Sequence, residues 1–373
     1  MWMMYVIGFI ASLGLALGLT PLVKKFAFKV GAVDVPNARK VHTKIMPRLG
    51  GLGIFLSFVI TLLLLLPFLP ETVSAREMNF IWAFLVGGTI TVLLGALDDR
   101  FDLPAKLKFV IQIATACVVV FGFDIRIEFV NIPFHTYSAL ETWVGIPFTI
   151  LWIVGVTNAI NLIDGLDGLA AGVSGIAIAT IAVMALVMGN VIVGLLCLLL
   201  LGSILGFLYF NFHPAKIFMG DSGALFLGFC LALLSLLGFK QVAIVSFLTP
   251  LILIGVPLSD TMFAIIRRWM QKKPIFSPDK GHLHHCLREL GFSHRQTVLI
   301  IYGIAAFFGV LAVIQSSAAM YNANWVTFVV ICVMVFFLQI GAEVIGLIGK
   351  TKRPLLNFLS RLRMKVGAER GSK

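Results

Sequence analysis

Long apolar stretches alternate with short polar connectors along the whole chain. Most are about as long as the 20 residues that a helix needs to cross a bilayer. Only helices and closed barrels satisfy their backbone hydrogen bonds in lipid, so the pattern predicts an all-α integral membrane protein with about eleven transmembrane helices. The expected spans are 3–23, 49–69, 79–97, 106–123, 143–160, 169–187, 190–210, 223–239, 242–266, 297–315 and 325–347.

Two segments depart from the simple pattern. The ninth span contains Pro250, Gly255 and Pro257, and prolines remove helical hydrogen bonds, so we expect this helix to be kinked or broken. Residues 124–130 alternate polar and apolar side chains, which is typical of a strand. A small β-hairpin ending near Pro133 is therefore possible on the outer side.

Positive charge is distributed unevenly between the two sets of connectors. One set carries 26 of the 29 Lys and Arg residues, and the other carries only Arg76, Arg126 and Lys240. By the positive-inside rule, the N-terminus is expected outside and the C-terminus in the cytoplasm of a multi-pass cell-membrane protein. We expect a single transmembrane catalytic domain over 1–347 and a basic cytoplasmic tail over 348–373. The expected cytoplasmic connectors are 24–48, 98–108, 161–168, 211–222 and 267–296.

Composition supports this class. The chain has 373 residues, of which 60% are hydrophobic and only 12% charged, whereas soluble domains carry about 25% charged residues. The net charge of +12 is concentrated at one membrane face, so we expect the lipid bilayer as a partner and no nucleic acid. Four of the five cysteines lie inside apolar runs, and no disulfide framework is implied.

Acidic and amide side chains gather at the ends of several predicted spans. Asp98 and Asp99 end the third span, and Lys108 follows them. Adjacent carboxylates repel each other unless a cation is near or a proton is shared. An ordinary polar helix end is the alternative, and Lys108 could equally be one more positive-inside lysine.

The stretch Asn158–Gly168 is the densest of these junctions. Asn161, Asp164 and Gly168 would share one helical face, and Asp167 adds another carboxylate. Carboxylate and carboxamide oxygens suit a hard cation such as Mg²⁺. A Gly/Asp-rich turn is the alternative interpretation.

Asp221 directly precedes the eighth span. The free backbone N–H groups at that helix start are expected to favour an anion. A simple N-cap role for Asp221 is the alternative, and the two roles are compatible.

A histidine-rich segment follows the ninth span. His282, His284 and His285 lie within four residues, downstream of Arg267 and Arg268. They are expected to contact phosphate or sugar oxygens. A transition-metal site that includes Cys286 and a plain surface histidine run are the alternatives.

The first cytoplasmic connector alternates cations with turn-forming residues from Asp34 to Gly51. It could fold over a nucleotide or a lipid phosphate, or simply carry positive-inside charge. Taken together, the connectors place Mg²⁺-type ligands beside phosphate-binding cations at one membrane face. This combination indicates phosphoryl transfer between a soluble and a membrane-anchored reactant.

Two other classes of function remain open on the residues alone. An ion-coupled membrane transporter would also have a broken helix and intramembrane acids, but near the bilayer midplane. Here all but a few acids lie at the predicted span ends, and Asp260 is the deepest exception. A lipid-binding scaffold would not require the Asn, Asp and His set.

These motifs, in this order, resemble the polyprenyl-phosphate N-acetylhexosamine-1-phosphate transferase family of membrane enzymes. The resemblance covers about residues 20–300, and the last two spans and the tail carry little of it. It rests on the Asp98–Asp99 pair, Asn158–Leu169 as the NAxNxxDGxDGL motif, Phe218–Asp221 as FMGD, His282–His285 as HxHH, and the Pro36–His42 and Pro47–Gly51 patterns.

The resemblance implies a Mg²⁺-dependent enzyme, with Mn²⁺ as a possible substitute. It would transfer GlcNAc-1-phosphate from UDP-GlcNAc to undecaprenyl phosphate and release UMP, starting a cell-envelope polymer such as a teichoic acid linkage unit or O-antigen. The active site would lie on the cytoplasmic face, and the chain could form a homodimer.

Site residues follow from the same resemblance. Asn161 and Asp221 would hold the metal, Asp98 would act as a base on the lipid phosphate, and Asp99 would support Asp98 or help bind metal. The nucleotide and sugar are expected to contact Asn158, Asp164, Asp167, His282, His284 and His285, and the phosphates to contact Lys108, Arg267 and Arg268.

Overall fold

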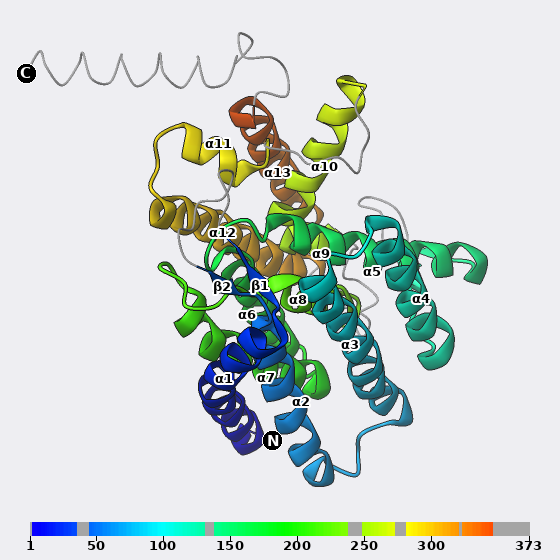
Figure 1. The fold of residues 1–373 in the computed structure, drawn as a ribbon. Coiled ribbons are helices and arrows are strands. Elements are labelled where there is room, and N and C mark those ends of the chain that lie inside the picture. The colour runs from blue at the N-terminus through cyan, green and yellow to red at the C-terminus, as the bar shows by residue number, and fades with distance from the viewer. Residues whose placement is uncertain are drawn as a thin grey trace, which may run out of the picture.

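The computed structural model describes residues 2–35, 45–130, 138–237, 248–272, 281–320 and 323–345. Part of the first connector (36–44), the expected hairpin turn near Pro133, residues 273–280 and the tail 348–373 lie outside the described residues. Within them the chain is almost entirely helical (Figure 1). The long helices are α1 (Trp2–Val30), α2 (Gly50–Leu65), α3 (Ala75–Phe101), α4 (Ala105–Phe123), α5 (Thr142–Ile163), α6 (Leu169–Val187), α7 (Val191–Asn211), α8 (Gly220–Leu237), α12 (His294–Met320) and α13 (Asn324–Ile345).

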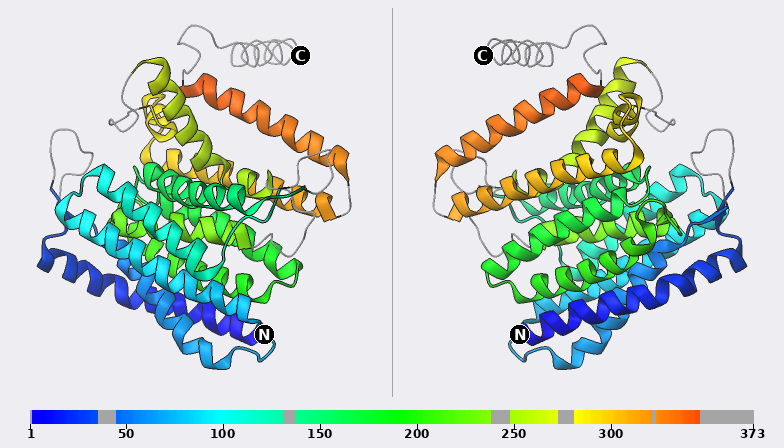
Figure 2. Two further views of the ribbon diagram at one scale, coloured as in Figure 1. Left: turned by 90° about the vertical axis from the view of Figure 1, so that its right-hand side faces the viewer. Right: turned by 90° about the vertical axis from the view of Figure 1, so that its left-hand side faces the viewer.

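Ten of the described helices are long and apolar enough to cross a membrane. They correspond to all of the expected spans except the ninth, which confirms the multi-pass helical class. Figure 2 shows most of these helices running roughly alongside one another, with α1 at one edge of the bundle and α12 and α13 at the other.

The ninth expected span is broken. It forms the short α9 (Leu248–Leu253) and then α10 (Gly255–Met270), with the interruption at Ile254. Pro257 has no N–H to bond to the carbonyl of Leu253, and its ring would crowd that carbonyl in a continuous helix. The prediction from the prolines is therefore confirmed, and α10 turns steeply away from the direction of the bundle (Figure 2).

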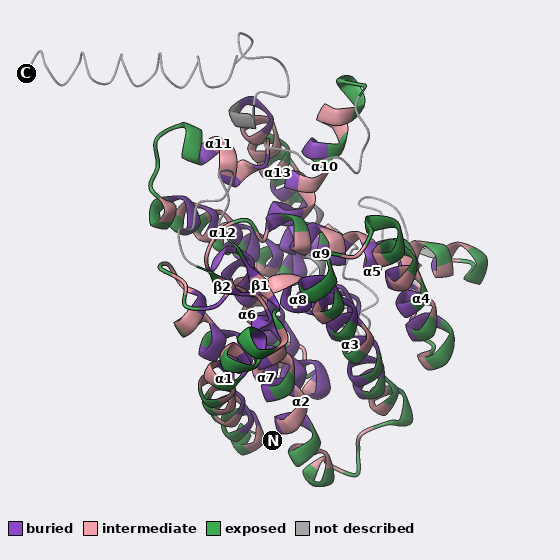
Figure 3. Cartoon of the chain, viewed as in Figure 1, coloured by how far each residue is buried: buried purple, intermediate pink, exposed green. Residues whose placement is uncertain are grey.

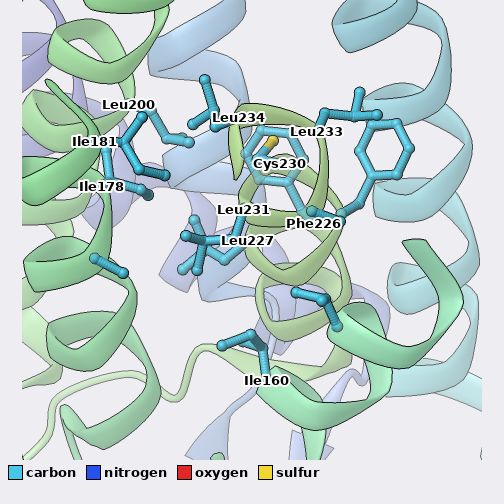
Figure 4. Packing of buried hydrophobic residues seen from close by; sticks show 14 of the residues in the cluster. Ile160, Ile178, Ile181, Leu200, Phe226, Leu227, Cys230, Leu231, Leu233 and Leu234 are labelled. Carbon is cyan, nitrogen blue, oxygen red and sulfur yellow. The ribbon is translucent and has the colours of Figure 1, made fainter. Parts of the chain in front are cut away.

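Helix α8 is the centre of the molecule. Every residue from Ser222 to Leu237 is buried, whereas α1 and α4 expose much of their outer surface (Figure 3). Side chains of α8 pack against α5, α6 and α7, with Leu227 and Leu231 facing Ile160 and Ile178 (Figure 4). A helix that is apolar all round requires neighbours on every side, and this one is held by α2, α3, α5 and α6.

Glycines allow the first turn of α8 to approach its neighbours closely. A side-chain carbon on Gly51 of α2 would overlap the backbone of Gly223, and one on Gly95 of α3 would overlap the backbone of Asp221 and Ser222. The absence of a Cβ at these contacts lets two backbones meet directly. The beginning of α8 is thus wedged between α2 and α3, which fixes the position of Asp221.

Two short antiparallel ladders complete the described structure. β3 (Phe129–Val130) pairs with β4 (Ser138–Ala139), which confirms the small hairpin, although its strands are shorter than the alternation indicated. β1 (Val33–Asp34) pairs with β2 (Met46–Pro47) in the first connector, a ladder that the sequence pattern did not predict.

Candidate active site

Asp98 lies in the last turn of α3, which extends further than the expected third span. The chain leaves this helix through Asp102 in a left-handed conformation with φ of 49°. One oxygen of the Asp98 carboxylate accepts the Leu103 backbone N–H at 2.7 Å, and the other accepts Lys108 Nζ at 2.8 Å. Asp98 therefore ties the end of α3 to the start of α4.

Lys108 links Asp98 to Asp221 at the start of α8. Its Nζ lies 3.1 Å from Asp221 Oδ2. The carboxylate of Asp221 also interacts with the side chains of Asp98 and Asn161. Side chains from α3, α4, α5 and α8 thus meet at one point, as the sequence predicted for a site built from distant segments.

Asp99 is oriented differently from Asp98. Its two carboxylate oxygens accept the backbone N–H groups of Asp221 at 2.9 Å and Ser222 at 3.1 Å. The expectation that these N–H groups would be free for an anion is wrong, because Asp99 already occupies them. This geometry favours a role for Asp99 in positioning Asp221 over direct contact with the reactants.

The first connector contributes a cation to the same place. Gly50 and Gly51 donate their N–H groups to the carbonyls of Phe218 and Met219 at 3.0 and 2.8 Å. These bonds position the neighbouring Arg48, which lies 3.6 Å from the exposed Asp102 and close enough to Asp99 and Asp221 for their charges to raise its pKa. Arg48 belongs to the Pro47–Gly51 motif, and nothing in that motif alone marks it as a residue of the site.

The electrostatics of the site are dominated by negative charge. Burial raises the pKa of Asp164 to about 8, and the charges of Asp221 and Asp99 add to the shift while Arg48 opposes it. Burial alone would lower the pKa of Arg48, but Asp99 and Asp34 among its neighbours raise it overall. The group as a whole therefore favours an additional cation.

The loop between α5 and α6 is held by two polar side chains that sequence reasoning missed. Asn211 accepts the Gly168 N–H at 3.0 Å and donates to the Ile217 carbonyl at 3.0 Å, which joins this loop to the segment before α8. Tyr302 of α12 donates its hydroxyl to the Gly168 carbonyl at 2.5 Å. No local motif marks these residues, because their partners lie far away in the chain.

Asp167 contacts a second group of polar side chains. Its Oδ2 lies 2.7 Å from His213 Nδ1 and accepts the Ala215 N–H at 3.2 Å. Asp167, His213 and His294 have ligand atoms within 4.8 Å of one another. The two imidazoles are stacked, however, with centroids 4.1 Å apart and planes 18° from parallel. A metal must lie close to the plane of each ligating ring, so this arrangement favours a packed hydrogen-bonded cluster over a metal site.

Asn158 lies one turn before Asn161 on α5. Its amide donates to Gln112 of α4 and to the carbonyl of Val154, the latter at 2.8 Å. The structure thus gives Asn158 a role in packing α5 against α4, and its expected contact with the nucleotide stays a prediction.

The histidine segment reaches the same loop from the other side. A side chain on Gly165 would overlap the ring of His284, so this glycine permits close contact between the two motifs. The rings of His282 and His284 lie parallel with centroids 6.0 Å apart, and His285 lies 4.2 Å from His284. Burial lowers the pKa of His284 to about 4, helped by the neighbouring His285, so this ring is neutral near pH 7.

Both arginines expected at the phosphates lie in the last turn of α10. Arg267 packs against Gly281, just before the histidines, and a side chain on this glycine would overlap the guanidinium. Arg268 is half-buried beside it.

Known proteins are similar in sequence to this chain over the helices that carry the site. A sequence model of glycosyl transferase family 4 matches residues 81–239, which hold most of α3 to α8. The probable undecaprenyl-phosphate N-acetylglucosaminyl 1-phosphate transferase of Bacillus subtilis is 48% identical over 358 residues, covering 96% of each chain. Decaprenyl-phosphate N-acetylglucosaminephosphotransferase of Mycobacterium tuberculosis is 33% identical over 314 residues, covering 76% of each chain.

A more distant relative spans nearly the whole chain as well. The undecaprenyl-phosphate alpha-N-acetylglucosaminyl 1-phosphate transferase of Escherichia coli K12 is 28% identical over 353 residues, covering 93% of this chain and 92% of its own. Together with the transmembrane fold, these similarities show that the chain belongs to the polyprenyl-phosphate N-acetylhexosamine-1-phosphate transferase family.

Proposed function

We propose that this protein transfers GlcNAc-1-phosphate from UDP-GlcNAc to undecaprenyl phosphate and releases UMP. The product, undecaprenyl-diphospho-GlcNAc, would begin a cell-envelope polymer of the teichoic acid or O-antigen type. Support comes from the family of relatives named for this reaction. The observation that carries the proposal is the meeting of Asp98, Lys108, Asn161 and Asp221 at one point.

This cluster fits a hard divalent cation. Asn161 and Asp221 offer an amide and a carboxylate oxygen, and Asp98 lies close enough to add negative charge. Asp164 would add a further negative charge once it releases its proton. Oxygen ligands of this kind suit Mg²⁺ or Mn²⁺. When bound there, the metal would offset the charge of the nucleotide diphosphate.

The reaction requires one bond to form and one to break. An oxygen of the lipid phosphate attacks the β-phosphorus of UDP-GlcNAc, and the bond from that phosphorus to the bridging oxygen breaks, so that UMP leaves with the electron pair. Lys108 neutralises charge beside the attacking phosphate, and Arg48, whose pKa Asp221 helps to raise, offers a second cation. The protein contributes mainly positioning and charge.

Asp98 is the candidate base of this reaction. A phosphate monoester is already mostly dianionic near pH 7, since its second pKa is about 6. The gain from a base is therefore modest, and the ion pair with Lys108 gives Asp98 an electrostatic role in addition.

The direct test of the function is release of UMP by purified protein. We expect release from UDP-GlcNAc only when undecaprenyl phosphate and Mg²⁺ are both present, and no release in the presence of a chelator. UMP formation without the lipid, or transport of an ion instead of any release, would contradict the proposal. Competition with other UDP-sugars in the same assay would measure the preference for GlcNAc.

A further inference from the structure

Asp260 is a buried carboxylate that the proposed function does not yet use. It lies on α10, past the break at Ile254, and only 4% of its surface is exposed. A buried charge requires close partners to offset its lost hydration. Here both partners come from the histidine segment.

The two oxygens of Asp260 have different partners. Oδ2 lies 2.9 Å from Nδ1 of His282, and Oδ1 accepts the backbone N–H of Leu283 at 2.8 Å. His282 is the N-cap residue of α11 (Leu283–Glu289) and is itself 6% exposed. One carboxylate thus fixes both the ring of the first histidine and the start of the short helix that carries the other two.

This contact determines which nitrogen of His282 is available for a ligand. A hydrogen bond from Nδ1–H to a carboxylate leaves Nε2 as the ring nitrogen that can meet a ligand. His284, which is packed on Gly165, is neutral near pH 7.

The surroundings of His282 indicate which part of the substrate it meets. Its neighbour His284 contacts the loop between α5 and α6, next to the metal-ligand cluster, and Arg267 packs on Gly281 immediately before it. α10 also packs against α5, the helix that carries Asn161. These neighbours place the segment beside the position expected for the nucleotide diphosphate.

We propose that Asp260 is a positioning residue for the transfer reaction, holding His282 so that its Nε2 forms a hydrogen bond with the nucleoside diphosphate sugar. This inference rests on the proposed function and deepens it. Asp260 itself does not touch the substrate and acts only through His282 and the start of α11.

A double-mutant cycle tests this role. Asp260→Asn and His282→Ala should each lower kcat/KM for UDP-GlcNAc about 10- to 100-fold, by analogy with the loss of a carboxylate that orients a metal-bound histidine. If Asp260 acts through His282, the double variant should be no worse than His282→Ala alone, within about threefold. The KM for undecaprenyl phosphate should stay unchanged in all three.

Two further variants separate positioning from general destabilisation. Ser259→Ala changes the adjacent residue of α10, whose hydroxyl donates to the Val256 carbonyl within the same helix, and should keep full activity. Asp260→Glu should restore part of the rate, because it keeps the carboxylate. Size-exclusion profiles and unfolding temperatures show whether each variant is folded, and Asp260→Glu replaces Asp260→Asn in the cycle if the latter does not fold.

The outcomes distinguish this inference from the proposed function. Wild-type protein that releases no UMP would overturn the proposed function and the inference together. Active wild type with an unaffected Asp260→Asn variant would overturn the inference alone. Losses from Asp260→Asn and His282→Ala that multiply in the double variant would do the same, because they would show independent effects.

Discussion

Asp98 and Asp99 are adjacent in the chain but face different partners. Successive residues of an α-helix point about 100° apart, so Asp98 meets Lys108 while Asp99 meets the backbone of α8. The sequence predicted that the pair belongs to the site. It could not distinguish the two roles, because each depends on which helix packs against which side of α3.

Other residues of the site were beyond prediction for a related reason. Asn211, Tyr302 and Asp260 each contact a segment that is remote in the chain. Motif reasoning finds residues that cluster in sequence, as in Asn158–Gly168, and it has no signal for isolated partners.

Replacing Asp99 should affect folding more than replacing Asp98. Asp99→Asn loses the charge that caps α8 and turns an amide N–H₂ toward a backbone donor, so we expect a loss of about 1–3 kcal/mol in unfolding free energy. Activity should fall with it, because Asp221 loses its anchor. Thermal unfolding in detergent together with UMP release measures both effects.

Asp98→Asn is the matched comparison. It keeps the fold and should lower kcat by weakening the hold on Lys108, with a smaller change in unfolding temperature. If Asp99→Asn were as stable as wild type, the capping role would be wrong.

The raised pKa of Asp164 predicts a pH dependence. The folded protein holds this proton to about pH 8, whereas an unfolded aspartic acid releases it near pH 4. The contribution of Asp164 to the free energy of unfolding is therefore fully present below about pH 4 and is lost as the pH rises from there through 8. In chelator, the unfolding temperature should fall between pH 6 and 8, and Asp164→Asn should flatten that slope.

Metal binding should show the opposite trend with pH. Asp164 must release its proton to offset the charge of a nearby cation, so the affinity for Mg²⁺ should rise between pH 6 and 8. Calorimetric titration with Mg²⁺ in buffers of different ionisation enthalpy measures how many protons are released on binding, which checks this prediction. Metal binding that releases no protons near pH 7 would contradict the raised pKa.

At the scale of elements, the local sequence predicted where a helix is interrupted, but it did not predict how the helices pack. Pro257 explains the interruption at Ile254 by a missing N–H, which is visible in the sequence. The central position of α8 was not predicted, because several spans are equally apolar. The β1–β2 ladder was also missed, since two-residue strands carry almost no pattern.

The close contact between α2 and α8 gives a prediction at this scale. Gly51→Ala should place a methyl group against the backbone of Gly223 and displace the start of α8. We expect a loss of at least about 2 kcal/mol in unfolding free energy, typical of overpacking a buried contact, and loss of UMP release.

Gly14→Ala in α1 is the control for this change. Nothing lies within 4 Å of the added methyl group, and alanine favours a helix over glycine by about 1 kcal/mol. This variant should be neutral or slightly stabilised. Equal effects of the two substitutions would show that the α2–α8 contact does not position the site.

At the scale of the whole molecule, the charge pattern predicts which end of the bundle faces the cytoplasm. The helices themselves fit either orientation. A cysteine at Glu71, in the exposed connector before α3, should react with an impermeant maleimide in intact cells. A cysteine at Arg295, at the start of α12, should react only after the membrane is opened.

The parent protein without an added cysteine gives the background for this labelling. Labelling of the Arg295→Cys variant in intact cells would contradict the predicted orientation and would place the site outside. The UDP-GlcNAc pool would then be on the wrong side for the proposed reaction.

The central claim is that one divalent cation is held where α3, α5 and α8 meet. Titration of the purified protein with Mn²⁺, followed by electron paramagnetic resonance, counts the bound ions directly. We predict one ion per chain that Mg²⁺ displaces, with binding strongly weakened in Asn161→Ala and Asp221→Asn and intact in Ser259→Ala. Stoichiometric Mn²⁺ binding that survives both Asn161→Ala and Asp221→Asn would contradict the account.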